Sequence, residues 1–213
     1  MTDLIVFLKA PVPGTVKTRL QTRYSPEEAA TLYRAFIHDG LETSGKAPVD
    51  RRIAAYSGDV SVVKDIVPSD WILVPQIEAE LGERMLAALN ASIVDGADKA
   101  ILIGTDIPSL PADHICSAIA RLDSAEVVLG PTTDGGFYLI GTRVGLPDAL
   151  PGIVWSTDRV FEDTSEAIQS VGLQLSLIPP WGDVDTPEDL DLALSQSQST
   201  MTHTRAAVSG INR

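Results

Sequence analysis

Asp106 is the acidic residue of this sequence that is best placed to do chemistry. It follows the short apolar run 100–103 and the turn residues Gly104 and Thr105, and a proline-containing segment, 108–111, comes directly after it. A carboxylate held after a buried strand can bind Mg²⁺ or Mn²⁺, which prefer oxygen ligands. Asp106 could instead be a turn former that caps its own backbone. Because the segment 108–111 already supplies a turn and a helix start, we predict the metal-binding role.

A cluster of cations follows the first apolar run of the chain. The loop carries Lys9, Lys17 and Arg19, two prolines stiffen it, and Gly14 permits a tight turn. A polyphosphate ligand needs such cations, because its charge must be neutralised and its leaving group stabilised. The alternative is a basic loop that contacts only solvent. Since the chain has a formal net charge of -13, this concentration of cations favours a phosphate site.

Two further loops combine acids with turn residues. The first, residues 130–137, places two adjacent glycines after Asp134, which would let a ligand approach the backbone, although a plain hairpin turn explains the same pattern. The second precedes the last predicted helix and contains Asp183 and Asp185. Neither acid is needed to start that helix, so one of them is a candidate second metal ligand.

Weaker signals lie in three other places. Trp155, Ser156 and Thr157 precede a predicted helix, where the hydroxyls could meet an anion or simply cap the helix. Gln76 could contact the edge of a base. Arg84 could pair with phosphate or lie on a helix surface.

The elements that must position these residues alternate along the chain. Short apolar runs, typical of strands covered on both faces, occupy residues 4–8, 52–56, 72–74, 100–103, 127–129, 137–140 and 175–178. Helices are predicted between them, at residues 25–37, 59–67, 81–94, 111–122 and 158–171, and a last one begins at Pro187. This alternation predicts an α/β fold, a three-layer α/β/α sandwich with a mostly parallel central sheet.

Composition narrows the class of protein. The chain has 213 residues, 44% of them hydrophobic, which suits one well-filled core, and we predict a single domain over residues 1–194. Residues 195–213 are rich in Ser, Thr and Gln, and we expect a poorly ordered tail. The acidic charge disfavours nucleic acid and anionic membranes as partners. Cys116 is the only cysteine, and the N-terminal segment lacks a basic region, so we expect a cytoplasmic protein.

Six ordered motifs resemble one known set. They are Lys17-Thr18-Arg19-Leu20, Leu81-Gly82-Glu83-Arg84-Met85, Gly104-Thr105-Asp106-Ile107-Pro108, Asp134-Gly135-Gly136-Phe137, Trp155-Ser156-Thr157 and Asp183-Val184-Asp185-Thr186-Pro187-Glu188-Asp189-Leu190. The set resembles a bacterial family of glycosyltransferase-like proteins with the GT-A fold, in the nucleotide-diphospho-sugar transferase superfamily. Its relatives include 2-phospho-lactate guanylyltransferase and molybdenum-cofactor guanylyltransferase. The resemblance spans about residues 4–194, although the segment 76–81 lacks the glycines usual in such proteins.

The resemblance implies a nucleotide-diphospho-sugar transferase fold in which Lys17 and Arg19 contact a triphosphate, Asp106 holds the metal and Asp185 completes the metal site. Asp183 and Asp134 remain alternatives for that second ligand. Residues and resemblance together predict nucleotide contacts at Lys9, Gly14, Lys17, Arg19, Gln76, Arg84, Gly104 and Thr105. They predict acceptor contacts at Asp134, Gly135, Gly136, Trp155, Ser156 and Thr157. The expected cofactor is Mg²⁺ or Mn²⁺.

Three functions are compatible with this site. The first is nucleotidyl transfer, in which Lys17, Arg19 and Asp106 help to join a nucleoside triphosphate to a small phosphorylated acceptor with release of pyrophosphate. The second is glycosyl transfer from a nucleotide-sugar to a small-molecule acceptor, although that class usually shows Asp-x-Asp where this chain has Gly104. The third is nucleotide binding without catalysis. The nucleotide base, the acceptor and the oligomeric state are not evident from the sequence.

Overall fold

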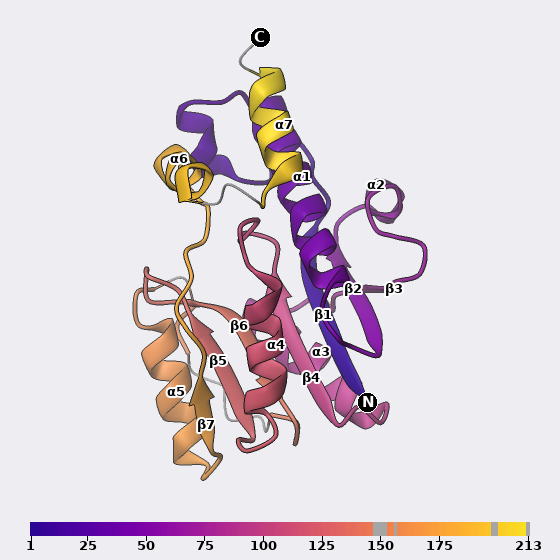
Figure 1. The fold of residues 1–213 in the computed structure, drawn as a ribbon, viewed down its shortest axis with the longest axis vertical. Coiled ribbons are helices and arrows are strands. Elements are labelled where there is room, and N and C mark those ends of the chain that lie inside the picture. The colour runs from indigo at the N-terminus through magenta and orange to yellow at the C-terminus, as the bar shows by residue number, and fades with distance from the viewer. Residues whose placement is uncertain (147–152, 156, 197–199, 212–213) are drawn as a thin grey trace.

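The apolar runs of the sequence form the strands of one central sheet. The computed structural model describes residues 1–146, 153–155, 157–196 and 200–211, and within them seven strands pair in the order β3-β2-β1-β4-β6-β5-β7 (Figure 1). The strands are β1 (Thr2–Lys9), β2 (Arg51–Ser57), β3 (Ile72–Pro75), β4 (Lys99–Gly104), β5 (Val127–Pro131), β6 (Phe137–Thr142) and β7 (Leu175–Leu177). Strand β6 runs antiparallel to both β4 and β5, and the other described pairs are parallel. The predicted fold class is therefore confirmed.

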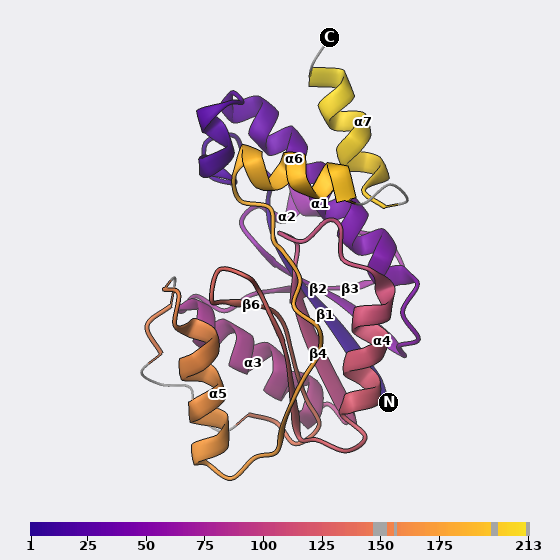
Figure 2. The ribbon, with the colours of Figure 1, turned by 60° about the vertical axis from the view of Figure 1, so that its left-hand side comes forward.

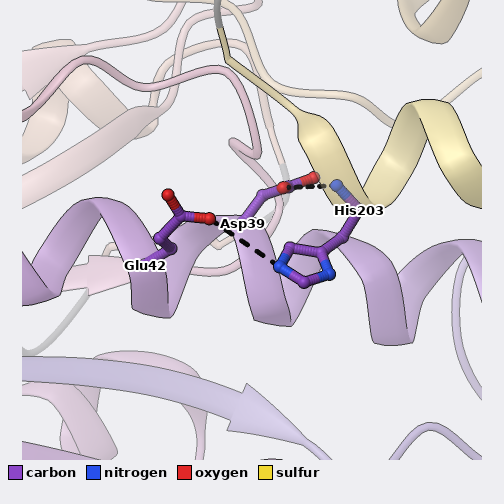
Figure 3. Close-up of side chains that lie close together, drawn as sticks. All are labelled: Asp39, Glu42 and His203. Atoms are coloured by element: carbon purple, nitrogen blue, oxygen red, sulfur yellow. Dashed lines mark hydrogen bonds and ion pairs between the residues drawn. The ribbon is translucent and has the colours of Figure 1, made fainter.

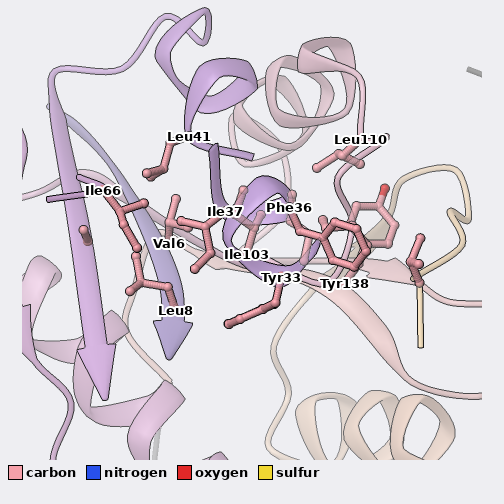
Figure 4. Close-up of a cluster of buried hydrophobic side chains, with 14 of the residues drawn as sticks. Val6, Leu8, Tyr33, Phe36, Ile37, Leu41, Ile66, Ile103, Leu110 and Tyr138 are labelled. Atoms are coloured by element: carbon pink, nitrogen blue, oxygen red, sulfur yellow. The ribbon is translucent and has the colours of Figure 1, made fainter. Parts of the chain in front are cut away.

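The strands contribute to a core on both faces of the sheet, because alternate side chains point to opposite faces. Val6 and Leu8 of β1 belong to the cluster shown in Figure 4, and Ile5 and Phe7 belong to a second cluster. The helices are η1 (Thr18–Thr22), α1 (Pro26–Gly45), α2 (Val60–Lys64), α3 (Leu81–Val94), α4 (Ala112–Arg121), α5 (Val160–Ser170), α6 (Pro187–Gln196) and α7 (Thr202–Ile211). Residues of α1 and α4 pack in the first cluster, and residues of α3 and α5 pack in the second. Figure 2 shows α3 and α5 on one side of the sheet and α4 on the other, which gives three layers.

Helix α1 begins where the sequence predicts. The Ser25 hydroxyl accepts a hydrogen bond from the Glu28 amide at 3.2 Å, and the Glu28 carboxylate accepts one from the Ser25 amide at 2.7 Å. These two bonds form a capping box and satisfy two amides that have no partner within the helix. None of the described helices combines the length and the apolar character needed to cross a bilayer.

The C-terminal segment differs from the poorly ordered tail that composition predicts. Residues 202–211 form α7, which lies beside α1 at one end of the molecule (Figures 1 and 2). The buried Asp39 of α1 caps it, because its carboxylate accepts hydrogen bonds from the amides of His203 and Thr204, both at 2.9 Å, and from the Thr204 hydroxyl at 2.6 Å. The prediction failed because the acceptor that stabilises the start of α7 lies more than 160 residues earlier in the chain.

Asp39, Glu42 and His203 lie close together in this contact (Figure 3). Their possible ligand atoms lie within 4.8 Å of one another, and the His203 Nε2 atom lies 3.7 Å from a Glu42 oxygen. Both Asp39 oxygens already accept hydrogen bonds from α7. Helix capping therefore accounts for the position of Asp39 without a metal ion.

We predict that Asp39→Ala lowers the free energy of unfolding by about 1–2 kcal/mol, the usual effect of losing a helix cap. The variant leaves the first amides of α7 without an acceptor inside a packed contact. Chemical denaturation monitored by circular dichroism measures the change. Glu42→Gln is the matched control, since Glu42 is an exposed neighbour that accepts no hydrogen bond from the α7 amides bound by Asp39. Equal unfolding free energies for Asp39→Ala and the wild type would contradict the capping role.

Candidate active site

The buried ammonium group of Lys17 joins the two acids that the sequence singles out. Its Nζ atom lies 2.6 Å from Asp106 Oδ1 and 2.8 Å from Asp185 Oδ1, and it donates a hydrogen bond to the Val184 carbonyl at 2.7 Å. The Lys17 side chain is only 4% exposed. Three acceptors thus surround the three N–H donors of one ammonium group, which satisfies it fully.

The electrostatics of this contact favour the charged form of Lys17. Burial alone lowers the pKa of Lys17, but the carboxylates of Asp106 and Asp185 outweigh that effect, and the net shift of the pKa is upward. The Phe36 ring lies beneath the same ammonium group, with its centroid 5.9 Å away. Lys17 is therefore a fixed positive charge between two carboxylates.

The backbone at Lys17 has an unusual conformation. Lys17 has φ 45° and ψ 47°, the left-handed region that non-glycine residues seldom adopt, and it directly precedes η1. The loop before it is braced by the Lys9 ammonium group, which donates to the Thr15 carbonyl at 2.9 Å. Gly14 has φ +77°, so the tight turn predicted for it is present. Local strain of this kind tends to occur at functional sites.

Asp106 stands at the end of β4, as the sequence predicts. The side chain of the preceding Thr105 is buried and contacts the Tyr33 hydroxyl at 2.9 Å, which anchors the turn to α1. The Asp106 carbonyl accepts a hydrogen bond from the Val184 amide at 2.8 Å. The Asp106 side chain remains 54% exposed. Its carboxylate is therefore held by its backbone but open to a ligand.

The loop between β7 and α6 is fastened to the segment after β4 and to strands β5 and β6. The Trp181 indole donates to the buried Ser109 hydroxyl at 3.0 Å, and the Trp181 amide donates to the Pro131 carbonyl at 3.1 Å. The Tyr138 hydroxyl donates to the Pro179 carbonyl at 2.9 Å. Sequence analysis did not identify Trp181 as a site residue, although a tryptophan just before a run of acids is a signal that could have been used.

Asp183 and Asp185 come from this loop, and their environments differ. Asp185 contacts Lys17 and also Arg19, whose guanidinium lies 3.3 Å from Asp185 Oδ2. Burial, together with the negative charges of Asp134 and Asp185, raises the pKa of Asp183 to about 6. Several carboxylates thus share a small volume in which negative charge is incompletely neutralised. This donor set of carboxylate oxygens fits a divalent cation such as Mg²⁺ or Mn²⁺.

Three cavities meet at Asp106. The basic cavity, about 310 Å³, lies beside Lys9, Thr15, Lys17 and Arg19. The strand-end cavity, about 320 Å³, lies at the ends of β1 and β4 and is lined by Lys9, Gln76, Arg84, Gly104 and Thr105, among other residues. The acidic cavity, about 500 Å³, is lined by Asp134, Trp155, Asp158 and Asp183, among others. Asp106 lines all three, so the structure brings most predicted site residues around one acid.

Gln76 and Arg84 lie together in the strand-end cavity. The Gln76 amide nitrogen donates to the Ala55 carbonyl at 2.8 Å, and its oxygen accepts from Arg84 at 2.8 Å. These bonds hold the Gln76 amide against the edge of the sheet. Contact with a base, as the sequence suggested, would require this amide to exchange its partners.

The loop 132–136 is the hairpin connection between β5 and β6. Asp134 accepts hydrogen bonds from the Thr132 hydroxyl and from the Gly136 amide within this loop. A Cβ atom on Gly135, where φ is +94°, would lie 2.0 Å from the Asp158 carbonyl oxygen. The close approach that the paired glycines predicted is therefore made by the protein's own backbone.

Trp155 and Thr157 line the same acidic cavity as residues of this hairpin. The Trp155 ring meets Phe137 edge-on, with centroids 6.2 Å apart. Thr157 lines the same cavity, and its hydroxyl donates to the Val154 carbonyl at 2.9 Å. Ser156, also predicted to contact the acceptor, lies outside the described residues. Nothing in the sequence singled out the neighbouring Asp158.

Comparison with known proteins agrees with the fold. A protein from Desulfovibrio desulfuricans G20, assigned to the nucleotide-diphospho-sugar transferases, is 32% identical and superimposes with a TM-score of 0.87 over 99% of this chain and 96% of its own. The structure of Rv0371c from Mycobacterium tuberculosis H37Rv in complex with manganese gives a TM-score of 0.51 at 16% identity, over 92% of this chain and 98% of its own. The latter shows a similarity of fold alone.

Two sequence relatives are nucleotidyltransferases. A phosphoenolpyruvate guanylyltransferase of Sphaerobacter thermophilus is 26% identical over 84% of this chain and 86% of its own. A 2-phospho-L-lactate guanylyltransferase of Methanothermobacter thermautotrophicus is 28% identical over 86% of this chain and 81% of its own. These relatives confirm the predicted transferase class.

The family assignment rests on a match that covers more than half of the chain. Residues 41–157 match the model of DUF2064, described as an uncharacterized protein conserved in bacteria. The matched range includes the strand-end turn with Asp106, the hairpin with Asp134 and the segment around Trp155. The chain belongs to the DUF2064 family.

Proposed function

We propose that this protein is a metal-dependent nucleotidyltransferase that joins a nucleoside triphosphate to a small phosphorylated acceptor and releases pyrophosphate. The main support for this proposal is the contact of Lys17 with Asp106 and Asp185. Asp106 also lines the basic, the strand-end and the acidic cavity. The two guanylyltransferase relatives support the same class of reaction and make GTP the first nucleotide to test.

The reaction needs no covalent intermediate on the protein. An oxygen of the acceptor's phosphate attacks the α-phosphorus of the triphosphate, a new P–O bond forms, and the bond to the bridging oxygen breaks. Pyrophosphate leaves with the electron pair of that bond. The protein supplies positioning and charge, as in other phosphoryl and nucleotidyl transfers.

The basic cavity suits the leaving pyrophosphate. Lys9 and Lys17 line it, and Arg19, whose side chain is 73% exposed, can turn toward a ligand at little cost. A divalent cation held by Asp106 and Asp185 would add positive charge next to the transferring phosphate. Lys17 holds these two carboxylates at a fixed spacing, so the site is organised before a ligand arrives.

Glycosyl transfer from a nucleotide-sugar is the second candidate. It is favoured by the likeness to the Desulfovibrio protein assigned to the nucleotide-diphospho-sugar transferases. Gly104 stands where an Asp-x-Asp motif would place its first acid, which favours nucleotidyl transfer. The products separate the two functions, because only nucleotidyl transfer releases pyrophosphate.

We predict that Asp106→Asn lowers the rate of pyrophosphate release by about 10²-fold or more while the protein stays folded. The substitution removes the negative charge shared by all three cavities and keeps the size of the side chain. A coupled pyrophosphate assay with GTP and Mg²⁺ measures the rate, and circular dichroism checks the fold. Asp70→Asn, an exposed acid outside these cavities, is the control. An Asp106→Asn variant that stays active with Mg²⁺ would refute the metal-binding role.

We predict that Lys17→Met lowers the free energy of unfolding by about 2 kcal/mol, because two carboxylates lose the cation between them. Mg²⁺ should then raise the melting temperature of this variant more than that of the wild type, since Lys17 no longer neutralises the acids that bind the ion. Arg19→Met is the control, as its side chain is mostly exposed. The same Mg²⁺ response in all three proteins would show that these carboxylates do not bind the ion.

A further inference from the structure

The charged residues that line the acidic cavity indicate which chemical groups an acceptor could carry. Asp106, Asp134, Asp158, Asp183 and Asp185 line it, and Arg19 is the one cation among the described residues that do so. Lys17 and a metal ion would compensate Asp106 and Asp185. Asp183 belongs to the same set of possible metal ligands, so Asp134 and Asp158 are the acids that would still face the acceptor.

Both of these acids are held in place by the backbone. The Phe161 amide donates to the Gly135 carbonyl at 2.8 Å, and Gly135 packs directly on the backbone of Asp158. This contact fixes the hairpin that carries Asp134 against the segment that carries Asp158. Both side chains are exposed and both line the acidic cavity. Neither is paired with a cation in the ion pairs of the described residues.

Part of the cavity lining is aromatic and fixed by packing. Trp155 meets Phe137 edge-on, and its indole rests against Gly82 at the second residue of α3. A Cβ atom on Gly82 would lie 2.3 Å from the indole, so a glycine is needed for this contact. Leu81 and Met85 add further apolar side chains to the lining. An acceptor in this cavity would therefore meet both apolar side chains and carboxylates.

Carboxylates accept hydrogen bonds and cannot donate them, so the groups that face Asp134 and Asp158 must be donors. A carboxylate on the acceptor would meet like charges there and would lose its hydration without gaining a partner. Hydroxyl and ammonium groups both satisfy the site, and the aromatic part of the lining suits either a polyol face or a cation.

We propose that the acceptor carries a hydroxyl or ammonium group, and no carboxylate, next to its reacting phosphate. This acceptor differs in that respect from the phosphoenolpyruvate and 2-phospho-L-lactate named for the two relatives. The inference rests on the proposed nucleotidyl transfer, and it concerns the acidic cavity of that same site.

Three acceptors that differ in one group test the proposal. They are 2-phospholactate, propane-1,2-diol 2-phosphate, in which a CH₂OH group replaces the carboxylate, and 1-aminopropan-2-yl phosphate, in which a CH₂NH₃⁺ group replaces it. Pyrophosphate release by the full chain is measured with each nucleoside triphosphate and Mg²⁺. We expect kcat/KM for the better of the hydroxyl and ammonium compounds to exceed that for 2-phospholactate at least about tenfold. The ranking of those two compounds identifies the donor group.

A charge reversal provides the second arm of the test. Asp158→Arg should shift the ratio of kcat/KM values toward 2-phospholactate by about tenfold or more and should leave KM for the nucleotide unchanged. Glu166→Arg is the matched control, since it makes the same charge change at an exposed position of α5 outside the cavity lining. Trp155→Ala should raise KM for the acceptor and not for the nucleotide.

The outcomes separate the two claims. Equal or better use of 2-phospholactate by the wild type would overturn the acceptor proposal and leave nucleotidyl transfer standing. An unchanged preference in Asp158→Arg would also overturn it. Absence of pyrophosphate with every nucleotide and all three acceptors would overturn the nucleotidyl transfer on which the proposal rests.

Discussion

The contact of Lys17 with Asp106 and Asp185 is the interaction on which the arrangement of the site depends. It joins the loop after β1, the turn after β4 and the loop before α6, segments that are far apart in the sequence. Two carboxylates this close would repel each other without a cation between them. The ammonium group can be buried because all three of its donors have acceptors.

Strand direction explains why these segments meet at all. Strands β1 and β4 are parallel neighbours, with Phe7 opposite Gly104, so the residues that follow them emerge at one edge of the sheet. Strand β6 runs the other way, and its first residue, Phe137, therefore lies at that same edge. A sheet that was parallel throughout would place the start of this strand, and the hairpin before it, at the opposite edge.

Much of this architecture could be predicted from local patterns. The apolar runs locate the strands, and the capping residues at Ser25 and Thr186 locate two helix starts, because these signals depend on near neighbours in the sequence. The patterns failed where a distant partner decides the structure. Helix α7 depends on Asp39, and Gly135 makes room for Asp158, so neither role could be inferred from adjacent residues. The position of Lys17 Nζ between two acids likewise depends on contacts between residues far apart in the sequence.

The charges around Asp106 also constrain how a nucleotide and an acceptor could share the site. Lys9, Lys17 and Arg19 surround the basic cavity, whereas Asp134, Asp158 and Asp183 line the acidic cavity. A triphosphate placed in the acidic cavity would meet like charges, and one placed in the basic cavity would meet cations. In the proposed reaction, the electric field across Asp106 would favour one orientation of the nucleotide, with its leaving phosphates away from the acceptor. In a chain with a net charge of -13, a few cations concentrated in one loop are sufficient to set that direction.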